Sequence, residues 1–96
     1  MKEKINVIVK YPCKPARMFT IPDELWVYQE LVGGYIETVA TDELVDALLI
    51  VNEEGRLLGL EENVLGLVGT VLLVGVDDED FADAPITPEE FDRRFK

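Results

Sequence analysis

The side-chain types in this 96-residue sequence exclude the commonest nucleophilic chemistry and leave carboxylates as the main candidates for catalysis. The chain contains neither serine nor histidine, so a serine–histidine nucleophile is excluded, and its single cysteine, Cys13, has no histidine to activate it. Carboxylates are abundant, and Glu37, Glu53 and Glu54 are expected near one end of the predicted sheet, where acid–base chemistry would be conceivable. No group that stabilises developing charge accompanies them, so we interpret them as solvated side chains and expect no enzymatic activity.

An acidic run near the end of the chain is the candidate for an acidic surface or a cation site. It comprises Asp77, Asp78, Glu79, Asp80 and Asp83. A calcium-binding loop starting at Asp78 fits poorly, because Ala82 fills its fifth position and Asp83 stands where glycine is required. Zinc ligation also lacks ligands. We therefore expect a solvated acidic surface, with no metal and no cofactor.

Two pairs of glycines, Gly33 with Gly34 and Gly66 with Gly69, suggest phosphate loops at first sight. Neither carries the lysine of a P-loop, and a strand rather than a helix is predicted after Gly34, so the helix dipole that would favour a phosphate is missing. We interpret all four as turn glycines.

Polar and amphipathic side chains near predicted strand ends are the candidates for binding. They are Tyr35, Glu37, Asn52, Glu54 and Arg56. Tyr35 and Glu37 are two residues apart in a predicted strand and therefore face the same way. The sequence predicts a small recognition surface at these residues, and the alternative is that they satisfy turns and sheet edges.

The net charge of −11 is unevenly distributed. Residues 1–17 hold five basic side chains and one acidic side chain, whereas residues 18–96 hold four basic and 19 acidic ones, which gives +4 and −15. An acidic surface repels nucleic-acid phosphates and acidic membranes, so we expect no direct nucleic-acid binding and no membrane binding. A protein partner with a cationic surface is the better electrostatic match.

Hydrophobic periodicity predicts the elements that position these residues. A hairpin is expected from strands at residues 4–11 and 17–21. A helix is expected to open at Pro22, Asp23 and Glu24, to bury Leu25, Tyr28, Leu31 and Val32, and to end at Gly33 in the left-handed region. Further strands are expected at residues 35–40, 47–51, 56–60 and 68–76, with a loop or single helical turn at 41–46, a turn at 52–55 and a short helical connection at 61–65.

The last residues predict a short helix. Thr87 fits the N-cap, Pro88 the first helical position and Glu90 the third, and Ile86 can meet Phe91 across the cap. The helix at 86–96 is expected to dock through Phe91 and Phe95 after an acidic linker at residues 77–85.

The chain is expected to be one domain, with an α+β core at residues 4–76. No apolar stretch is long enough for a membrane helix, and no secretory signal is predicted, so a cytoplasmic location is expected. The single cysteine permits no internal disulfide.

These elements predict the α+β class, with a mixed sheet, one packed helix and a short C-terminal helix. Their order matches that of the β-grasp, the ubiquitin-like architecture. An α+β roll with a differently ordered sheet uses the same elements.

Several motifs carry a family resemblance. The segment Leu31-Val32-Gly33-Gly34-Tyr35-Ile36-Glu37, the turn Asn52-Glu53-Glu54-Gly55-Arg56 with Asn63 after it, and the stretch from Gly69-Thr70 to Val74-Gly75-Val76-Asp77-Asp78 occur in one order. On these motifs the chain resembles a domain-of-unknown-function family, numbered three-eight-four-six. The resemblance implies a setting in phages, conjugative elements and their bacterial hosts, and it implies no catalytic residue.

We therefore expect a non-enzymatic, protein-binding accessory module of a phage or mobile element. Two alternatives stay open. One is an acidic DNA mimic that blocks a defence protein, motivated by the −15 carried after residue 17. The other is a small-molecule or nucleotide-binding module using Tyr35, Asn52 and Arg56.

Overall fold

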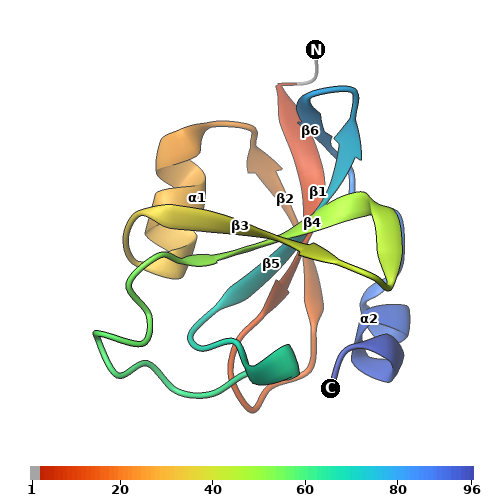
Figure 1. Cartoon of the computed structure of the whole chain (residues 1–96). Coiled ribbons are helices and arrows are strands. Elements are labelled where there is room, and N and C mark those ends of the chain that lie inside the picture. The colour runs from red at the N-terminus through yellow and green to blue at the C-terminus, as the bar shows by residue number, and fades with distance from the viewer. Residues whose placement is uncertain (1–2) are drawn as a thin grey trace.

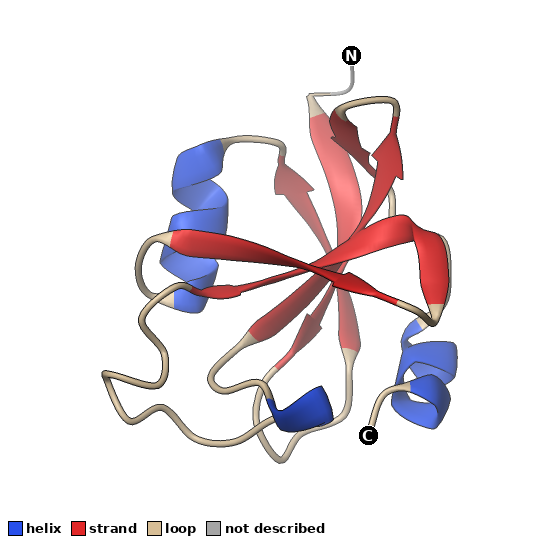
Figure 2. Ribbon diagram, in the orientation of Figure 1, coloured by secondary structure: helices blue, strands red, loops and turns tan. Residues whose placement is uncertain are grey.

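A computed structural model describes residues 3–96, which form six strands and two α-helices (Figures 1 and 2). In chain order the elements are β1 (Lys4–Lys10), β2 (Arg17–Pro22), α1 (Leu25–Val32), β3 (Ile36–Thr41), β4 (Leu44–Asn52), the 3₁₀ turn η1 (Val64–Gly66), β5 (Val71–Asp77), β6 (Asp80–Ala82) and α2 (Pro88–Arg94). The predicted α+β class is confirmed.

The strands form one antiparallel sheet in the order β2-β1-β5-β4-β3, with β6 also paired to β5. The prediction of a mixed sheet is therefore wrong for the described strands, and the β-grasp order is not confirmed. Residues 41–46, expected as a loop or helical turn, are mostly strand: Thr41 ends β3, residues 42–43 form the hairpin turn, and β4 begins at Leu44. β4 therefore begins earlier than predicted. No strand forms at residues 56–60, where one was expected, and residues 56–59 form turns. With no strand at residues 56–60, β4 pairs directly with β5 and runs antiparallel to it.

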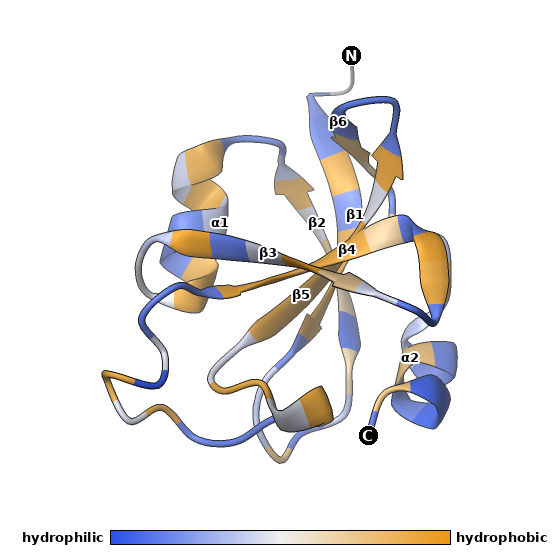
Figure 3. Cartoon of the chain, in the orientation of Figure 1, coloured by the Kyte–Doolittle hydropathy of each residue, from blue (hydrophilic) through white to orange (hydrophobic). Residues whose placement is uncertain are grey.

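Strand β5 is the centre of the core. Val71, Leu72, Leu73 and Val74 are all fully buried, and they alternate between two hydrophobic clusters. Val71 and Leu73 face the cluster that holds α2, whereas Leu72 and Val74 face the cluster that holds α1. The two helices therefore cover opposite faces of the sheet, and β4 and β5 are its most hydrophobic strands (Figure 3). A strand covered on both faces is apolar at every position for this reason.

Helix α1 buries Val27, Tyr28 and Val32, with Leu31 packed beside them. This stripe leaves Leu25 and Trp26 outside, at 57% and 59% exposure, so the prediction that Leu25 faces the sheet is wrong. The helix also begins later than predicted, because Pro22 is the last residue of β2. The predicted stop at Gly33 is confirmed by its φ of 80° in the left-handed region.

The hydroxyl of Tyr28 donates to Asp23 Oδ1 over 2.6 Å and so ties the body of α1 to the segment before it. Burial, and then this hydrogen bond, raises the pKa of Tyr28 well above its ordinary value. The ring of Tyr28 meets that of Phe81 edge-on at 5.4 Å, which connects α1 to β6.

The segment predicted as an acidic linker, residues 77–85, is largely structured. Asp77 pairs with Asp80 across a turn in which Asp78 has a φ of 57°, and β6 continues along β5 to the pair Gly75–Ala82. A Cβ at Gly75 would clash with the Asp83 carbonyl oxygen, so only glycine fits there. After β6, Ala84 N donates to Asn6 O over 2.8 Å and attaches the segment to β1.

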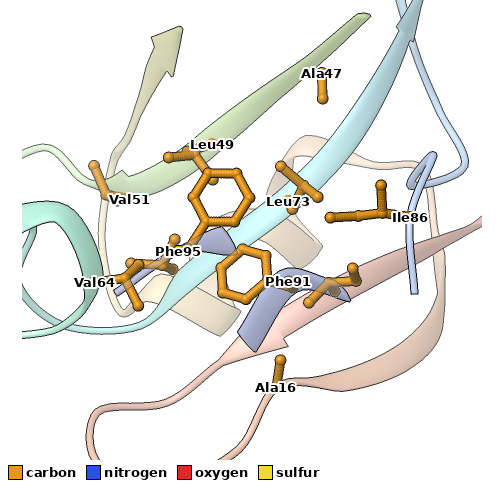
Figure 4. Close-up of a cluster of buried hydrophobic side chains, with 11 residues drawn as sticks. Ala16, Ala47, Leu49, Val51, Val64, Leu73, Ile86, Phe91 and Phe95 are labelled. Carbon is orange, nitrogen blue, oxygen red and sulfur yellow. The ribbon is translucent and has the colours of Figure 1, made fainter. Parts of the chain in front are cut away.

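Helix α2 confirms the predicted cap. Thr87 Oγ1 accepts a hydrogen bond from Glu90 N over 3.1 Å, and Pro88 is the first helical residue. Phe91 and Phe95 stack at 4.6 Å between centroids and are almost fully buried against the sheet (Figure 4). With eight and seven residues, α1 and α2 are both too short to cross a membrane, and they are the only α-helices of residues 3–96.

Replacing Phe91 by alanine should destabilise the fold by about 3–5 kcal/mol, because a fully buried aromatic ring is lost and a cavity remains. Urea unfolding followed by far-UV circular dichroism measures this change. The matched control is Trp26→Ala, which truncates an exposed aromatic side chain and should change stability by no more than about 0.5 kcal/mol. Equal effects of the two substitutions would contradict the placement of α2 on the core.

Candidate surface for partner binding

Two adjoining hollows lie where the end of α1, the β3–β4 hairpin and residues 53–68 meet. The first has a volume of about 210 Å³ and an apolar floor formed by Val39, Val51, Leu67 and Val68. The second has a volume of about 260 Å³ and lies against Gln29, Gly33, Gly34, Tyr35 and Leu58. Asn52 and Glu54 line both hollows. We refer to the residues that line them as the two-hollow surface.

All five predicted binding residues lie on the two-hollow surface. Tyr35 lines the second hollow, Glu37 and Arg56 line the first, and Asn52 and Glu54 line both. The fold thus brings together residues from two separate segments of the chain, 35–37 and 52–56. Their role in binding stays a prediction.

The predicted acidic surface lies elsewhere. Asp77, Asp78, Glu79 and Asp80 form the turn between β5 and β6, and Asp83 follows β6. This turn is at the far end of β5 from Leu67 and Val68, about 20 Å along a strand of seven residues (Figure 1). The acidic turn and the two-hollow surface are therefore separate.

Asn52 lines both hollows, and its side chain fixes the backbone around them by hydrogen bonds. Its side chain is only 5% exposed, donates from Nδ2 to the carbonyl oxygen of Val32 over 3.1 Å, and accepts from Glu54 N at Oδ1 over 2.7 Å. A Cβ on Gly34 would lie 2.9 Å from Asn52 Nδ2, so the close approach requires glycine. For Asn52, the alternative to a binding role is supported, namely that the residue satisfies local backbone groups. Its two hydrogen bonds are to backbone groups of a turn and of a helix end.

Tyr35 and Glu37 are presented by the edge of the sheet. Glu53 N donates to the carbonyl oxygen of Tyr35 over 2.8 Å, which extends the β3–β4 ladder by one pair beyond Ile36 and Asn52. The Tyr35 side chain remains 68% exposed. It therefore offers an amphipathic ring at the rim of the second hollow, where a partner could bury it.

Arg56 forms a hydrogen bond across the segment between β4 and β5. Its Nη2 donates to the carbonyl oxygen of Gly66 over 2.6 Å, and Gly55 allows the close contact with Val68. The guanidinium therefore braces the loop, while Glu37, Glu53 and Glu54 stand around the first hollow. The rim of this hollow is acidic.

Two leucines at this site were not predicted from the sequence. Leu57 and Leu58 are 85% and 59% exposed, and they belong to the turns that replace the expected strand at residues 56–60. The signal was present in the two glycines at positions 55 and 59, because glycine weakens a strand interior and here brackets a segment of only three residues. Large apolar side chains left exposed at the rim of a hollow are typical of interaction surfaces.

Cys13 is not part of this surface. Its thiol is exposed and donates to Glu61 Oε2 over 3.2 Å, and this hydrogen bond, together with the charge of Glu61, raises the pKa of Cys13 above its ordinary value. A protonated thiol is a poor nucleophile. Within residues 3–96, no group of three or more acidic or cysteine side chains is arranged to hold a metal ion.

These features define a class: a small α+β protein with one antiparallel sheet between two short helices and a shallow surface with an apolar floor and an acidic rim. The family model described as Domain of unknown function (DUF3846) matches residues 4–96, and the chain belongs to this family. The resemblance stated from the sequence motifs is thereby confirmed. No curated protein and no solved structure matches the chain.

Asn52→Ala should lower the free energy of unfolding by about 2–4 kcal/mol, because the Val32 carbonyl and the Glu54 amide each lose a partner at roughly 1–3 kcal/mol per group. Urea midpoints measure the loss. Gln29→Ala, which removes an amide from the same surface within a helix, should stay within about 0.5 kcal/mol. If Asn52→Ala is as stable as Gln29→Ala, the bracing role of Asn52 is wrong.

Glu61→Gln should accelerate alkylation of Cys13 by iodoacetamide at pH 8. Removing the carboxylate charge lowers the thiol pKa toward its ordinary value, which raises the fraction of reactive thiolate at that pH. Mass spectrometry of timed samples measures the rate. Glu62→Gln changes the neighbouring carboxylate, which is not bonded to the thiol, and should leave the rate unchanged; similar rates in both variants would contradict the assignment.

Proposed function

We propose that this chain is a non-enzymatic protein-binding module that takes a basic, amphipathic segment of a partner protein on the two-hollow surface. The proposal rests on three large exposed side chains, Tyr35, Leu57 and Leu58. They line the two hollows, whose rim bears carboxylates. Their burial by a partner would supply the affinity, and the carboxylates would supply the preference for basic sequences.

The size of the hollows favours a protein side chain over a free small molecule. At about 210 and 260 Å³ they are smaller than the roughly 300–1,000 Å³ of typical small-molecule sites. A lysine or arginine side chain suits the first hollow well, because its methylene stem can lie on Val39, Val51 and Leu67 while its charged end meets the rim.

The polar groups at this surface argue for binding rather than catalysis. Asn52 and Arg56 both donate to backbone carbonyl oxygens, of Val32 and Gly66, and so hold the loop in place. A small-molecule site using Tyr35, Asn52 and Arg56 is disfavoured for the same reason, since two of its three polar groups are already engaged.

The proposed setting is the cytoplasm of a bacterium that carries a phage or mobile element. The family resemblance supports the mobile element, and a chain with a single cysteine is compatible with a reducing compartment. Acting there as an accessory factor, the module would occupy a surface on one host or phage protein.

Selection of a random 12-residue peptide library on the immobilised protein tests this function. We expect enrichment of sequences that combine lysine or arginine with large apolar residues. Affinity of the enriched peptides for a Tyr35→Ala, Leu58→Ala double variant should fall at least about tenfold, which corresponds to about 1.4 kcal/mol.

Val45→Ala is the matched control, because Val45 is 99% exposed and lines neither hollow. Its affinity for the same peptides should be unchanged. Peptides that bind the double variant as tightly as the parent would overturn the proposal. Binding that is lost only on neutralising Asp77, Asp78, Glu79 and Asp80 would favour the DNA mimic instead.

A further inference from the structure

Strand β3 is an open edge of the sheet. It pairs with β4 on one side, and no other described strand lies beyond it. The hydrogen bond from Glu53 N to the Tyr35 carbonyl oxygen fixes the phase of the ladder, because it shows that the backbone of Tyr35 faces β4. In an antiparallel pair this direction alternates along the strand. The N–H and C=O groups of Glu37 and Val39 therefore also face β4.

The same alternation directs the N–H and C=O groups of Ile36, Thr38 and Ala40 away from the sheet. The register is regular across these residues, and the irregularity begins only between Ala40 and Thr41. β3 therefore presents three donors and three acceptors along one straight edge. That is the template on which an extended segment adds as a further strand.

The opposite edge of the sheet is different. β2 begins at Arg17 and ends at Pro22, which has no N–H to donate. Lysine, arginine and proline are the residues that commonly prevent strand addition at an exposed edge. β3 contains none of the three. The two edges of this sheet are therefore unequal, and β3 is the one suited to pairing.

The negative charge around β3 determines which segments can pair with this strand. Residues 36–54 carry six carboxylates and no lysine or arginine. The carboxylates are Glu37, Asp42, Glu43, Asp46, Glu53 and Glu54. A second copy of this chain, pairing β3 with β3, would bring two such acidic hairpins together and is disfavoured by like-charge repulsion. A basic segment is favoured, because its positive charges are attracted to the same carboxylates.

We infer that β3 accepts an extended, basic segment of a partner protein as an added strand, hydrogen-bonded to the outward groups of Ile36, Thr38 and Ala40. The inference rests on the proposed function and states how the partner binds. Glu37 and Val39 lie on the same face of β3 and both line the first hollow. The segment therefore carries a lysine or arginine opposite Glu37 and an apolar residue opposite Val39, two positions apart.

The probe for this inference is the synthetic peptide acetyl-Thr-Lys-Thr-Val-Thr-Lys-Thr-amide, titrated at millimolar concentration. Amide hydrogen exchange measured by NMR should be fast at Ile36, Thr38 and Ala40 in the free protein and at least about tenfold slower with the peptide bound. Glu37 and Val39, whose amides face β4, should be protected in both states. A peptide that binds without slowing exchange at the three outward amides, or that does not bind at all, would overturn the inference.

Methylation of alternate peptide nitrogens gives a second readout that leaves the protein untouched. In an antiparallel or parallel strand pair, only every second N–H of the added strand donates to β3. One alternating set of N-methyl groups should abolish binding and the other should be tolerated. Equal loss or equal tolerance for the two sets would contradict strand addition. Replacing both lysines of the peptide by glutamate should also abolish binding.

On the protein, Thr38→Pro removes one outward donor without removing a bond to β4, and it should reduce affinity for the peptide at least tenfold. Thr38→Val is the matched control, because it keeps the N–H and the branched shape.

The library peptides distinguish failure of this inference from failure of the proposed function. Peptides that depend on Tyr35 and Leu58 but leave exchange at β3 unchanged would overturn strand addition alone. Peptides whose binding does not depend on Tyr35 and Leu58 would overturn the proposed function.

Discussion

The position of β5 between β1 and β4 is the constraint on which the rest of the structure depends. Both of its edges are hydrogen-bonded to neighbouring strands, and α1 and α2 cover its two faces. Because β4 must lie beside β5, the hairpin partner β3 is placed at the outer edge of the sheet. The end of β4 lies beside the start of β5, yet residues 53–70 connect them by a long excursion, and that connection forms one side of the two hollows.

This connection, residues 53–70, contains no strand and only one turn of 3₁₀ helix. Backbone hydrogen bonds within its turns satisfy most of its polar groups, and side chains satisfy several others. Asn52 and Arg56 bond the carbonyl oxygens of Val32 and Gly66. Asn63 donates to the carbonyl oxygens of Lys10 and Gly69 over 2.8 and 2.7 Å, and so joins the end of β1 to the loop before β5. Asn52 and Arg56 thus act within the fold, which leaves contact with a partner to the exposed apolar side chains and the carboxylates around them.

The sequence predicted the features that depend on neighbouring residues. The first hairpin, the helix stop at Gly33 and the cap at Thr87 each follow from a short local pattern. Strand order could not be predicted in this way, because it depends on pairs such as Ile8 with Leu73 that no local pattern encodes. The leucines at 57 and 58 resembled a strand because exposed and buried apolar residues look alike in sequence. The five candidate residues lie near one another because they are at the start of β3 or at and after the end of β4, and these two strands pair. Their role in binding stays a prediction.

The pairing of β1 with β5 also affects how the chain folds during synthesis. Ile8 meets its partner Leu73 only after 65 further residues have been made. Until then β1 and β2 form a two-stranded ribbon, which is marginally stable in water. Ile8, fully buried in the finished sheet, faces the cluster that includes Leu73, Phe91 and Phe95, so it stays uncovered throughout that interval. Non-local pairing of this kind slows folding, and the nascent chain therefore passes through a long period in which this ribbon is open to aggregation or to chaperones.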